Sequence, residues 1–251
     1  MNLNELFKRL LQDLPDGEVT GVNVGNYRAA VTVKVDGEIR CGLASNVSEK
    51  PDPDDLLARN MVGLPGRELA KFVLSDQKLD VSIGLATINA LLPHLPHKWV
   101  DLNSREFIAQ LGRNKTVVIV GHFPFVPELR PRVGKLIVLE QKPKEDDLPA
   151  SAASDVIPQA DVLAITAMTL VNGTFDHLMS LRRPGMPTLL LGPTTPLSPI
   201  LFEMGVTVLS GSVVEQPLPV VNGVIEDAGF RKLRKMGIRL VSMVKDDLPI
   251  Q

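Results

Sequence analysis

Cysteine is nearly absent from this sequence, which holds a single residue of that type, Cys41. One cysteine cannot form an internal disulfide bond, so a reducing cytoplasm is the simplest location to expect. The chain also lacks the cysteine pairs that soft-metal sites usually contain. Cys41 lies in an alternating, strand-like stretch, and we expect it to be a small residue of the core.

Aromatic residues are scarce as well, at 4% of the chain, with one tryptophan and one tyrosine. So few rings argue against a surface on which nucleic-acid bases stack. The formal net charge of −2 gives no electrostatic reason to expect nucleic acid or an anionic membrane as a partner. No apolar run reaches the roughly 20 residues of a membrane span, and the first residues form an amphipathic pattern that is not typical of a signal peptide.

What the chain does contain is a regular alternation of apolar runs and helix-like stretches in its second half. The runs TVVIV at 116–120 and KLIVL at 135–139 are short and apolar, and about the length of a compact crossover separates them. Further strands are predicted at 161–166, 187–191, 206–209 and 238–243, and helices near 124–130, 150–159, 174–183, 196–204 and 228–236. This alternation indicates a parallel sheet with helices on both faces. We therefore predict a Rossmann-like, doubly wound α/β domain over residues 101–251.

The first hundred residues follow a different plan. A leucine stripe predicts a helix over 3–14, and Asp36-Gly37 is the strongest hairpin signal in the chain, within an antiparallel meander. After a polar loop at 46–55, helical patterns cover 55–62, 66–74 and 80–92. Asn103 and Glu106 have the spacing of a capping box at the start of a further helix. These patterns predict a smaller α+β domain over residues 1–100, with the boundary between 93 and 103.

The segments that directly follow the predicted parallel strands are the candidates for a ligand site. In an open parallel sheet, ligands bind outside the carboxyl ends of the strands, where the strand order reverses. Most of these segments are rich in glycine, serine and threonine, which let backbone N–H groups approach a polar or anionic ligand. Short β–α loops also use these residues for turns and caps, and this alternative stays open for each loop taken alone. The residues that we expect to bind a ligand are Gly121, Glu140, Thr169, Asn172, Thr174, Gly192, Thr194, Ser210, Gly211 and Ser212.

His122 directly follows the first of these strands, inside the expected site. A histidine there suits a metal ion or general acid–base catalysis, and a loop histidine without a role is the alternative. His94 and His97 have an H-x-x-H spacing, but the prolines at 93 and 96 argue against the helix that would bring them onto one face. The acidic stretch at 143–149 is expected to be an exposed loop.

The cofactor signals are weak. Gly121 lacks the two further glycines of the dinucleotide-binding fingerprint, so NAD or FAD in the usual mode is not expected. Glu140 ends the second strand, where an acid can hold ribose hydroxyl groups, as in many S-adenosylmethionine-dependent methyltransferases. A solvated acid at a strand end is the alternative. The sequence contains no H-E-x-x-H, paired C-x-x-C, P-loop or G-x-S-x-G motif.

Several runs of the sequence resemble a known family. They are TVVIVGHFP, VLEQKP, ADVLAITAMTLVNGTFDHLM, LLLGPTTPLSPILFEMGVTVLSGSVV and GFRKLRKMG in the second half, with CGLASN and IGLATINALL in the first. The resemblance is to a family of unknown function labelled "putative heavy-metal chelation". Its members join a domain similar to the enolase N-terminal domain to a Rossmann-like domain.

The resemblance implies a ligand cleft between the two domains and a role in handling a transition metal or a metal-bearing organic ligand. On this hypothesis the chain binds a small polar or anionic molecule, with His122 as the acid–base group or the metal contact. Two alternatives stay open. One is an enzyme, either a transferase that uses S-adenosylmethionine or a lyase acting on a small metabolite, and the other is a structural interaction module. A homo-oligomer is compatible with the sequence, which does not specify the assembly.

Overall fold

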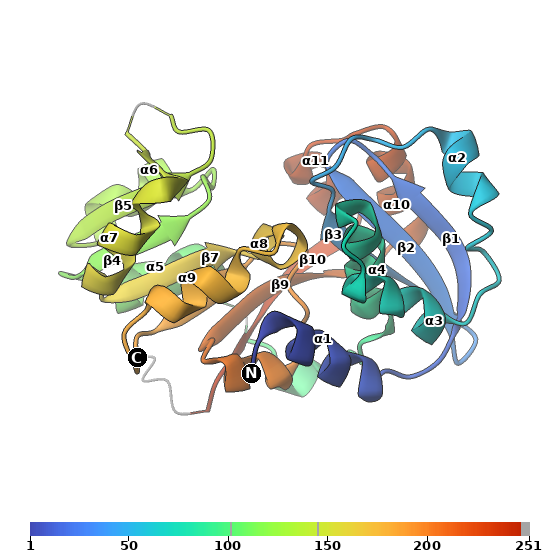
Figure 1. The fold of residues 1–251 in the computed structure, drawn as a ribbon, viewed down its shortest axis with the longest axis horizontal. Coiled ribbons are helices and arrows are strands. Elements are labelled where there is room, and N and C mark those ends of the chain that lie inside the picture. The colour runs from blue at the N-terminus through green and yellow to red at the C-terminus, as the bar shows by residue number, and fades with distance from the viewer. Residues whose placement is uncertain (101, 145, 247–251) are drawn as a thin grey trace.

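The computed structural model describes residues 1–100, 102–144 and 146–246. Within these ranges the strands form two sheets, which Figure 1 shows side by side. A three-stranded antiparallel sheet has the order β1-β2-β3, and a seven-stranded sheet has the order β10-β9-β8-β7-β4-β5-β6. The predicted combination of a Rossmann-like α/β part with a smaller α+β part is confirmed.

The elements divide at about residue 100, and 3-10 helices are labelled η. The first part contains α1 (Leu3–Gln12), β1 (Glu18–Val24), β2 (Arg28–Val35), β3 (Glu38–Ser45), α2 (Pro53–Ala58), α3 (Gly66–Ala70), η1 (Lys71–Leu74), α4 (Lys78–Leu91) and η2 (Pro96–Lys98). The second part contains α5 (Ser104–Leu111), β4 (Thr116–Val120), α6 (Val126–Leu129), η3 (Arg130–Arg132), β5 (Lys135–Glu140), β6 (Leu148–Pro149), η4 (Ala150–Ala152), α7 (Ala153–Val156), η5 (Ile157–Gln159), β7 (Val162–Thr166), α8 (Met168–Asn172), α9 (Phe175–Leu181), β8 (Thr188–Leu191), η6 (Pro199–Met204), β9 (Val208–Val214), α10 (Pro217–Ile225), α11 (Phe230–Lys235) and β10 (Ile238–Val244).

Local sequence explains where the first elements begin and turn. Asn2 caps α1, because its side chain accepts a hydrogen bond from the Glu5 N–H while the Glu5 carboxylate accepts one from the Asn2 N–H, each at 2.9 Å. Asp36 and Gly37 join β2 to β3 with φ angles of 53° and 86°, which a tight two-residue hairpin turn requires. The predicted helix and hairpin are both present.

The larger sheet is covered on both faces. Side chains of β4 alternate, so that Val118 joins one apolar cluster while Val117 and Ile119 join another. Helices α7 and α9 contribute to the first cluster, and α5 and α6 to the second. The sheet departs from the expected parallel arrangement at β10, which pairs antiparallel with β9. The chain leaves β9 at Val214, and α10 and α11 bring it back to this same end, so that β10 starts with Ile238 opposite Val214. Strand β10 therefore runs along β9 in the opposite direction.

Several predicted helices of the second part are shorter or tighter than expected. Where an α-helix was predicted over 196–204, the chain forms the 3-10 helix η6, and α6 covers only part of 124–130. The stretch 150–159 is divided among η4, α7 and η5. Pro131 follows α6 and Pro158 lies inside the stretch 150–159, and neither has the backbone N–H that a longer α-helix would need there. Among the described residues, no helix has the length and apolar character that a membrane crossing requires.

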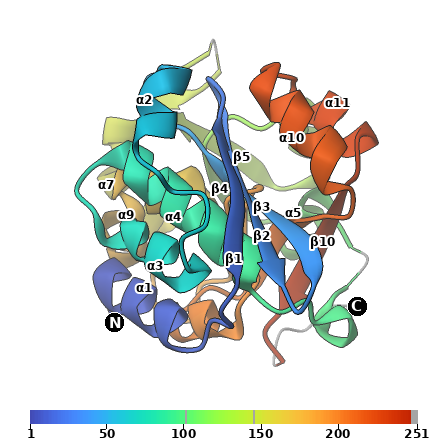
Figure 2. The same ribbon diagram turned by 90° about the vertical axis from the view of Figure 1, so that its right-hand side faces the viewer.

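The small sheet also buries both of its faces. Ala29 and Val31 of β2 belong to the cluster that includes α4, whereas Ala30 and Leu43 pack with α10 and α11. Figure 2 shows α4 and α10 on opposite sides of this sheet. Helix α10 lies outside the predicted helices, because two prolines occupy its first turn and two of its exposed residues, Leu218 and Ile225, are apolar. The division of the chain into 1–100 and 101–251 remains a prediction, since a helix from the second part covers the first.

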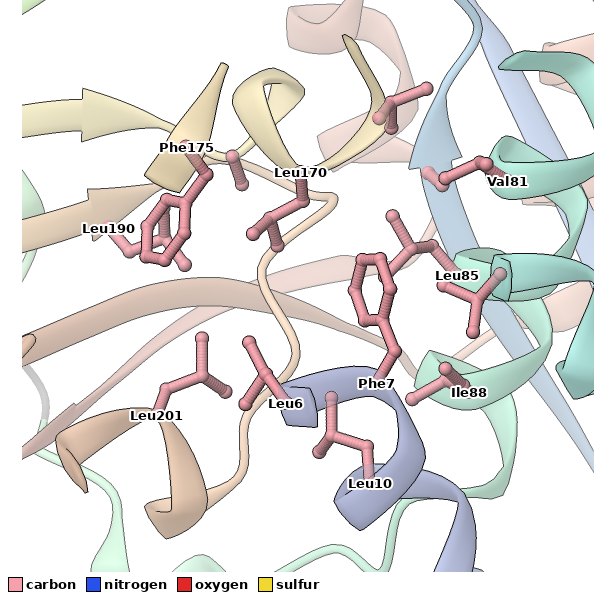
Figure 3. Close-up of a cluster of buried hydrophobic side chains, with 14 of the residues drawn as sticks. Leu6, Phe7, Leu10, Val81, Leu85, Ile88, Leu170, Phe175, Leu190 and Leu201 are labelled. Carbon is pink, nitrogen blue, oxygen red and sulfur yellow. The ribbon is translucent and has the colours of Figure 1, made fainter. Parts of the chain in front are cut away.

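Helix α1 joins the two sheets through a shared apolar cluster. Its buried residues Leu6, Phe7 and Leu10 lie between α4 and elements of the larger part, as Figure 3 shows. The neighbours drawn there are Val81, Leu85 and Ile88 of α4, with Leu170, Phe175, Leu190 and Leu201 of the second part. The first and second parts of the chain therefore share one dry core.

The close packing of β3 on α4 generates a first prediction. A Cβ atom added at Gly42 would collide with the backbone of Ala86 and Ala90 in α4, and a helix backbone cannot move aside as a side chain can. We expect Gly42→Ala to lower the free energy of unfolding by about 2–3 kcal/mol, measured by urea denaturation.

Gly229 provides the matched control for this substitution. Its φ of −60° and ψ of 150° suit any residue, and nothing lies within 4 Å of an added Cβ. Gly229→Ala should leave stability unchanged or raise it by about 0.4–1 kcal/mol. Equal stabilities of the two variants would contradict the packing argument.

Candidate functional site

The strand order of the larger sheet reverses next to β4. From β4 the chain continues on one side to β5 and β6, and then crosses to the other side to form β7 and β8. The carboxyl ends of β4 and β7 therefore form the switch point at which ligands bind in sheets of this kind. Gly121 and His122 follow β4 at this point, and Thr166 ends β7. The residues predicted to follow β4 therefore lie at the switch point, and ligand binding there stays a prediction.

His122 is held at this edge by a buried carboxylate. Its Nδ1 lies 2.8 Å from Oδ2 and 3.1 Å from Oδ1 of Asp147. The Asp147 side chain is 1% exposed, whereas that of His122 is 19% exposed. Because a carboxylate accepts hydrogen bonds, Nδ1 carries the proton in this pair, so in the neutral form of the ring Nε2 is the nitrogen with the lone pair. His122 therefore has an oriented ring and one nitrogen available for a metal ion or a proton.

Burial and hydrogen bonding shift the pKa of the Asp147 carboxyl group in opposite directions. Burial raises the pKa of its carboxyl group, but hydrogen bonds from the Lys144 N–H and from His122, with the charges of both residues, outweigh burial. The net effect holds the pKa of Asp147 below its ordinary value, so the group is a carboxylate at neutral pH.

Asp147 was not among the predicted site residues, and the prediction of an exposed acidic loop over 143–149 is wrong at this position. Asp146 is exposed as expected and pairs with Arg130 at 3.5 Å. Asp147 differs because Leu148 and Pro149 form β6, which pairs with the end of β5 and places Asp147 beside the switch point. A sequence signal did exist, in the apolar Leu148 directly after the acidic run, but it is too short to predict a strand.

Glu140 fixes the backbone of the same site. Its Oε2 accepts a hydrogen bond from the His122 N–H at 2.9 Å, and its Oε1 accepts one from the Gln141 N–H at 2.7 Å. Gly121 has a φ of 100°, which a side chain would strain, and an added Cβ would lie 3.1 Å from the Thr166 side chain. Gly121, His122, Glu140 and Asp147 are thus brought together, and a ribose-binding role for Glu140 stays a prediction.

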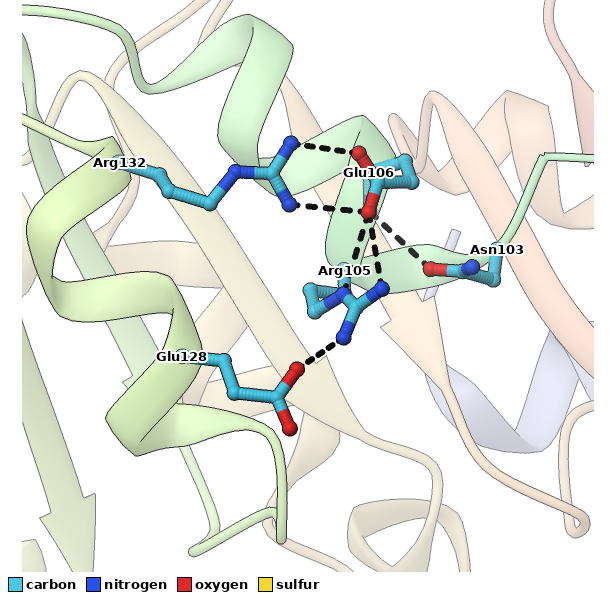
Figure 4. Close-up of polar contacts among 5 residues, drawn as sticks. All are labelled: Asn103, Arg105, Glu106, Glu128 and Arg132. Atoms are coloured by element: carbon cyan, nitrogen blue, oxygen red, sulfur yellow. Dashed lines mark hydrogen bonds and ion pairs between the residues drawn. The ribbon is translucent and has the colours of Figure 1, made fainter.

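A charged network, shown in Figure 4, links α5 to α6 and η3, the two helices that follow the loop of His122. Arg132 makes two hydrogen bonds to the Glu106 carboxylate, at 2.9 and 2.5 Å, and Arg105 joins Glu106 to Glu128 of α6. The hydrogen bonds from Arg132 lower the pKa of Glu106 to about 2. Asn103 caps α5 as predicted, although the Glu106 side chain binds arginines in place of completing the capping box.

Other predicted residues already have partners within the protein. Thr169 donates to the carbonyl of Thr166 at 2.7 Å, and the Asn172 side chain accepts from both the N–H and the hydroxyl of Thr174. These contacts stabilise the turn between α8 and α9, and a ligand-binding role for the three residues stays a prediction.

The residues predicted to follow β8 and β9 contact other parts of the molecule. The prediction that Ser210, Gly211 and Ser212 follow a strand is wrong, because β9 extends to Val214 and pairs with β10 along these residues. The Thr194 hydroxyl accepts from the N–H of Ser45 at 2.8 Å and thereby ties the second part to β3. Ser210 pairs with Ser242 of β10 at 2.8 Å. Gly192 has a φ of 112° and open space around it. Gly211 packs against Leu197, and Ser212 lines a pocket that does not include His122. The predicted residues therefore do not form one continuous surface.

The depressed pKa of Asp147 generates a prediction about pH. An unfolded aspartate has a pKa of about 3.9, so the folded protein holds the charged form more strongly. The stability that this group supplies is present above that value and is lost as the pH falls through the lower folded pKa. We expect Asp147→Asn to lower the free energy of unfolding at pH 7 by about 1–3 kcal/mol.

The difference in unfolding free energy between wild type and Asp147→Asn should shrink as the pH falls below about 4, in chemical denaturation at a series of pH values. Asp146→Asn, at the exposed neighbouring position, is the control and should show little difference at any pH. A difference for Asp147→Asn that stays constant from pH 7 to pH 3 would contradict the proposed ionisation.

Comparison with known proteins identifies relatives of the whole chain. Residues 105–242 match the model of a family described as "putative heavy-metal chelation", and residues 7–92 match a second model with the same description. No curated protein matches the chain significantly.

Two solved structures share the fold. A protein with unknown function from the DUF364 family of Desulfitobacterium hafniense DCB-2 is 29% identical, with a TM-score of 0.82 over 97% of this chain and 98% of that chain. A protein with unknown function from the same family in Pyrococcus horikoshii is 18% identical, with a TM-score of 0.82 over 98% of this chain and 100% of that chain. The matched residues cover more than half of the sequence, and the chain accordingly belongs to the DUF364 family, described as "putative heavy-metal chelation".

Proposed function

We propose that this protein binds a metal ion, carried by a small polar or anionic organic ligand, at the switch point of the larger sheet. The observation that supports the proposal is the pairing of His122 Nδ1 with the buried carboxylate of Asp147. Histidines that bind metals in proteins commonly donate their second ring N–H to a carboxylate in this way. His122 would contact the metal through Nε2.

The surroundings of His122 explain why the metal would arrive with ligands of its own. Within the described residues, no group of three or more histidine, cysteine, aspartate or glutamate side chains could enclose a metal ion. Asp147 is occupied by His122 and Lys144, and Glu140 is occupied by backbone N–H groups. One imidazole nitrogen fills one coordination position, so an organic chelator would supply the others.

The loop that carries His122 suits a polar or anionic molecule beside the metal. Gly121 has no side chain to obstruct the edge, and Glu140 holds the backbone of His122 in one conformation. A ligand cleft between the two parts of the chain, and a cytoplasmic location for the protein, belong to the same proposal. The metal is cargo on this proposal, and no catalytic step is required of the protein.

Metal binding in histidine variants tests the proposal. We expect His122→Ala to weaken binding of Ni²⁺ or Zn²⁺, each offered free and as its citrate complex, by at least about tenfold, because the protein's own ligand is removed. Asp147→Asn should weaken binding by about 10- to 100-fold, because the imidazole loses its orienting partner. Isothermal titration calorimetry, with native mass spectrometry of the gently purified protein, measures both effects.

His177, an exposed residue of α9, supplies the matched control. His177→Ala should bind these probes as the wild type does. Equal affinities of the His122 and His177 variants would rule out the proposed contact. A retained adduct with the mass of a nucleoside would instead favour the alternative of an S-adenosylmethionine-dependent enzyme, and no adduct would argue against tight, permanent metal binding.

A further inference from the structure

A pocket lies where the two parts of the chain meet, and it shares no residue with the group of Gly121, His122, Glu140 and Asp147. Its floor and walls come from the end of α4, the segment that includes residues 92–99, the loop after β8, and β9. The pocket has a volume of about 20 Å³, which is room for at least one water molecule. It is therefore a place for a single small group.

Three residues that line this pocket each carry a buried polar atom without a hydrogen-bond partner. Among the described residues, Asn89 Oδ1, Thr195 Oγ1 and Ser212 Oγ are buried and unpaired, and all three residues line the pocket. Thr195 is 1% exposed. Buried polar groups in proteins are nearly always paired, so three such atoms around one cavity indicate an occupant that bonds to them.

The hydrogen bonds of Asn89 determine what the occupant must offer. Asn89 Nδ2 donates to the carbonyls of Leu43 at 2.8 Å and Thr194 at 3.2 Å, and carbonyl oxygens can only accept. The amide orientation is therefore settled, and Oδ1 is the unpaired atom. It needs a donor, whereas the two hydroxyl groups can donate or accept.

Charge narrows the class of occupant. Among the residues that the structure describes, no carboxylate lines the pocket, so a cation would have no counter-charge from them, and Asn89 Oδ1 would repel an anion. His94, at the rim, is neutral at physiological pH, because partial burial of its ring and the charge of Arg40 lower its pKa. An uncharged group with an O–H bond satisfies all three unpaired atoms and is the size of a water molecule.

The walls favour a ligand over an enclosed water. Pro93 and His94 are exposed, so the pocket reaches the surface, and Leu92, Trp99 and Leu197 provide apolar sides. Apolar walls with a few convergent polar groups are typical of small-molecule sites. We infer that this pocket binds an uncharged, hydroxyl-bearing small molecule, which inserts one hydroxyl group between Asn89, Thr195 and Ser212.

Trp99 makes the inference testable in the intact protein, because it is the single tryptophan of the chain and lines the pocket. Ethylene glycol and glycerol are the probes, and 1,2-dimethoxyethane, which has no O–H donor, is the control compound. We expect a saturable change of Trp99 fluorescence with the two alcohols and none with the ether. Thr195→Val, which keeps the side-chain shape, should weaken binding about fivefold or more.

The variants separate a ligand site from a water site. Ser212→Ala is the second variant, should Thr195→Val fail to fold in circular dichroism, and Thr20→Val, at an exposed threonine of β1, should bind like wild type. A linear, unsaturable response would overturn the inference and leave an ordered water as the occupant. Equal affinities in wild type, Thr195→Val and Ser212→Ala, or an equal response to the ether, would overturn it as well.

Discussion

The small antiparallel sheet buries side chains on both of its faces, and this requirement ties the beginning of the sequence to its end. One face packs on α4, which follows the sheet in the chain, but the other packs on α10, which begins at residue 217. Asp227, just after α10, accepts hydrogen bonds from the backbone and side chain of Asn26 at 2.5 and 2.6 Å. Without α10, the second face of the sheet would stand in water, at a cost of roughly 25 cal/mol for each Å² of apolar surface exposed.

The same arrangement determines where the seam between the two parts lies. Helix α1 packs against α4 on one side and against residues of the larger part on the other, so apolar burial closes most of the interface. Two hydrogen bonds also cross this interface. The Thr194 hydroxyl accepts one from the Ser45 N–H, and Asn89 Nδ2 donates one to the Thr194 carbonyl. The pocket at Thr195 and Ser212 is a polar gap in an interface that is otherwise filled. A gap of this kind costs stability unless something occupies it.

The His122 site depends on hydrogen bonds rather than on apolar packing. The Glu140 carboxylate holds the backbone of the loop through the His122 N–H, and the Asp147 carboxylate holds the imidazole ring of His122. The charged network of Glu106 and Arg132 supports the helix that follows the loop. Positioning groups of this sort make a single exposed nitrogen effective as a ligand, because its direction is set before anything binds. The metal-binding role proposed for His122 rests on this geometry and not on the fold, since Rossmann-like sheets serve many functions.

Much of the fold could be predicted from the sequence because its signals are local. The apolar strands with helices between them, the Asp36-Gly37 hairpin and the leucine stripe of α1 each depend on residues a few positions apart. His122 could be selected for the same reason, since it directly follows a strand whose carboxyl end faces the switch point.

Only the tertiary structure decided which groups meet. In the sequence Asp147 resembles its exposed neighbour Asp146, and only the pairing of β6 with β5 places it beside His122. Helix α10 showed no clear periodic pattern, because its exposed residues Leu218 and Ile225 are apolar. Ser212 was selected together with the residues around His122, but in the structure it lines a separate pocket with Asn89 and Thr195. Whether a side chain is buried, and whether it has a hydrogen-bond partner, depends on residues that are far apart in the chain. A sequence pattern does not show which of these residues come close in space, so only the packing of the folded chain decided these contacts.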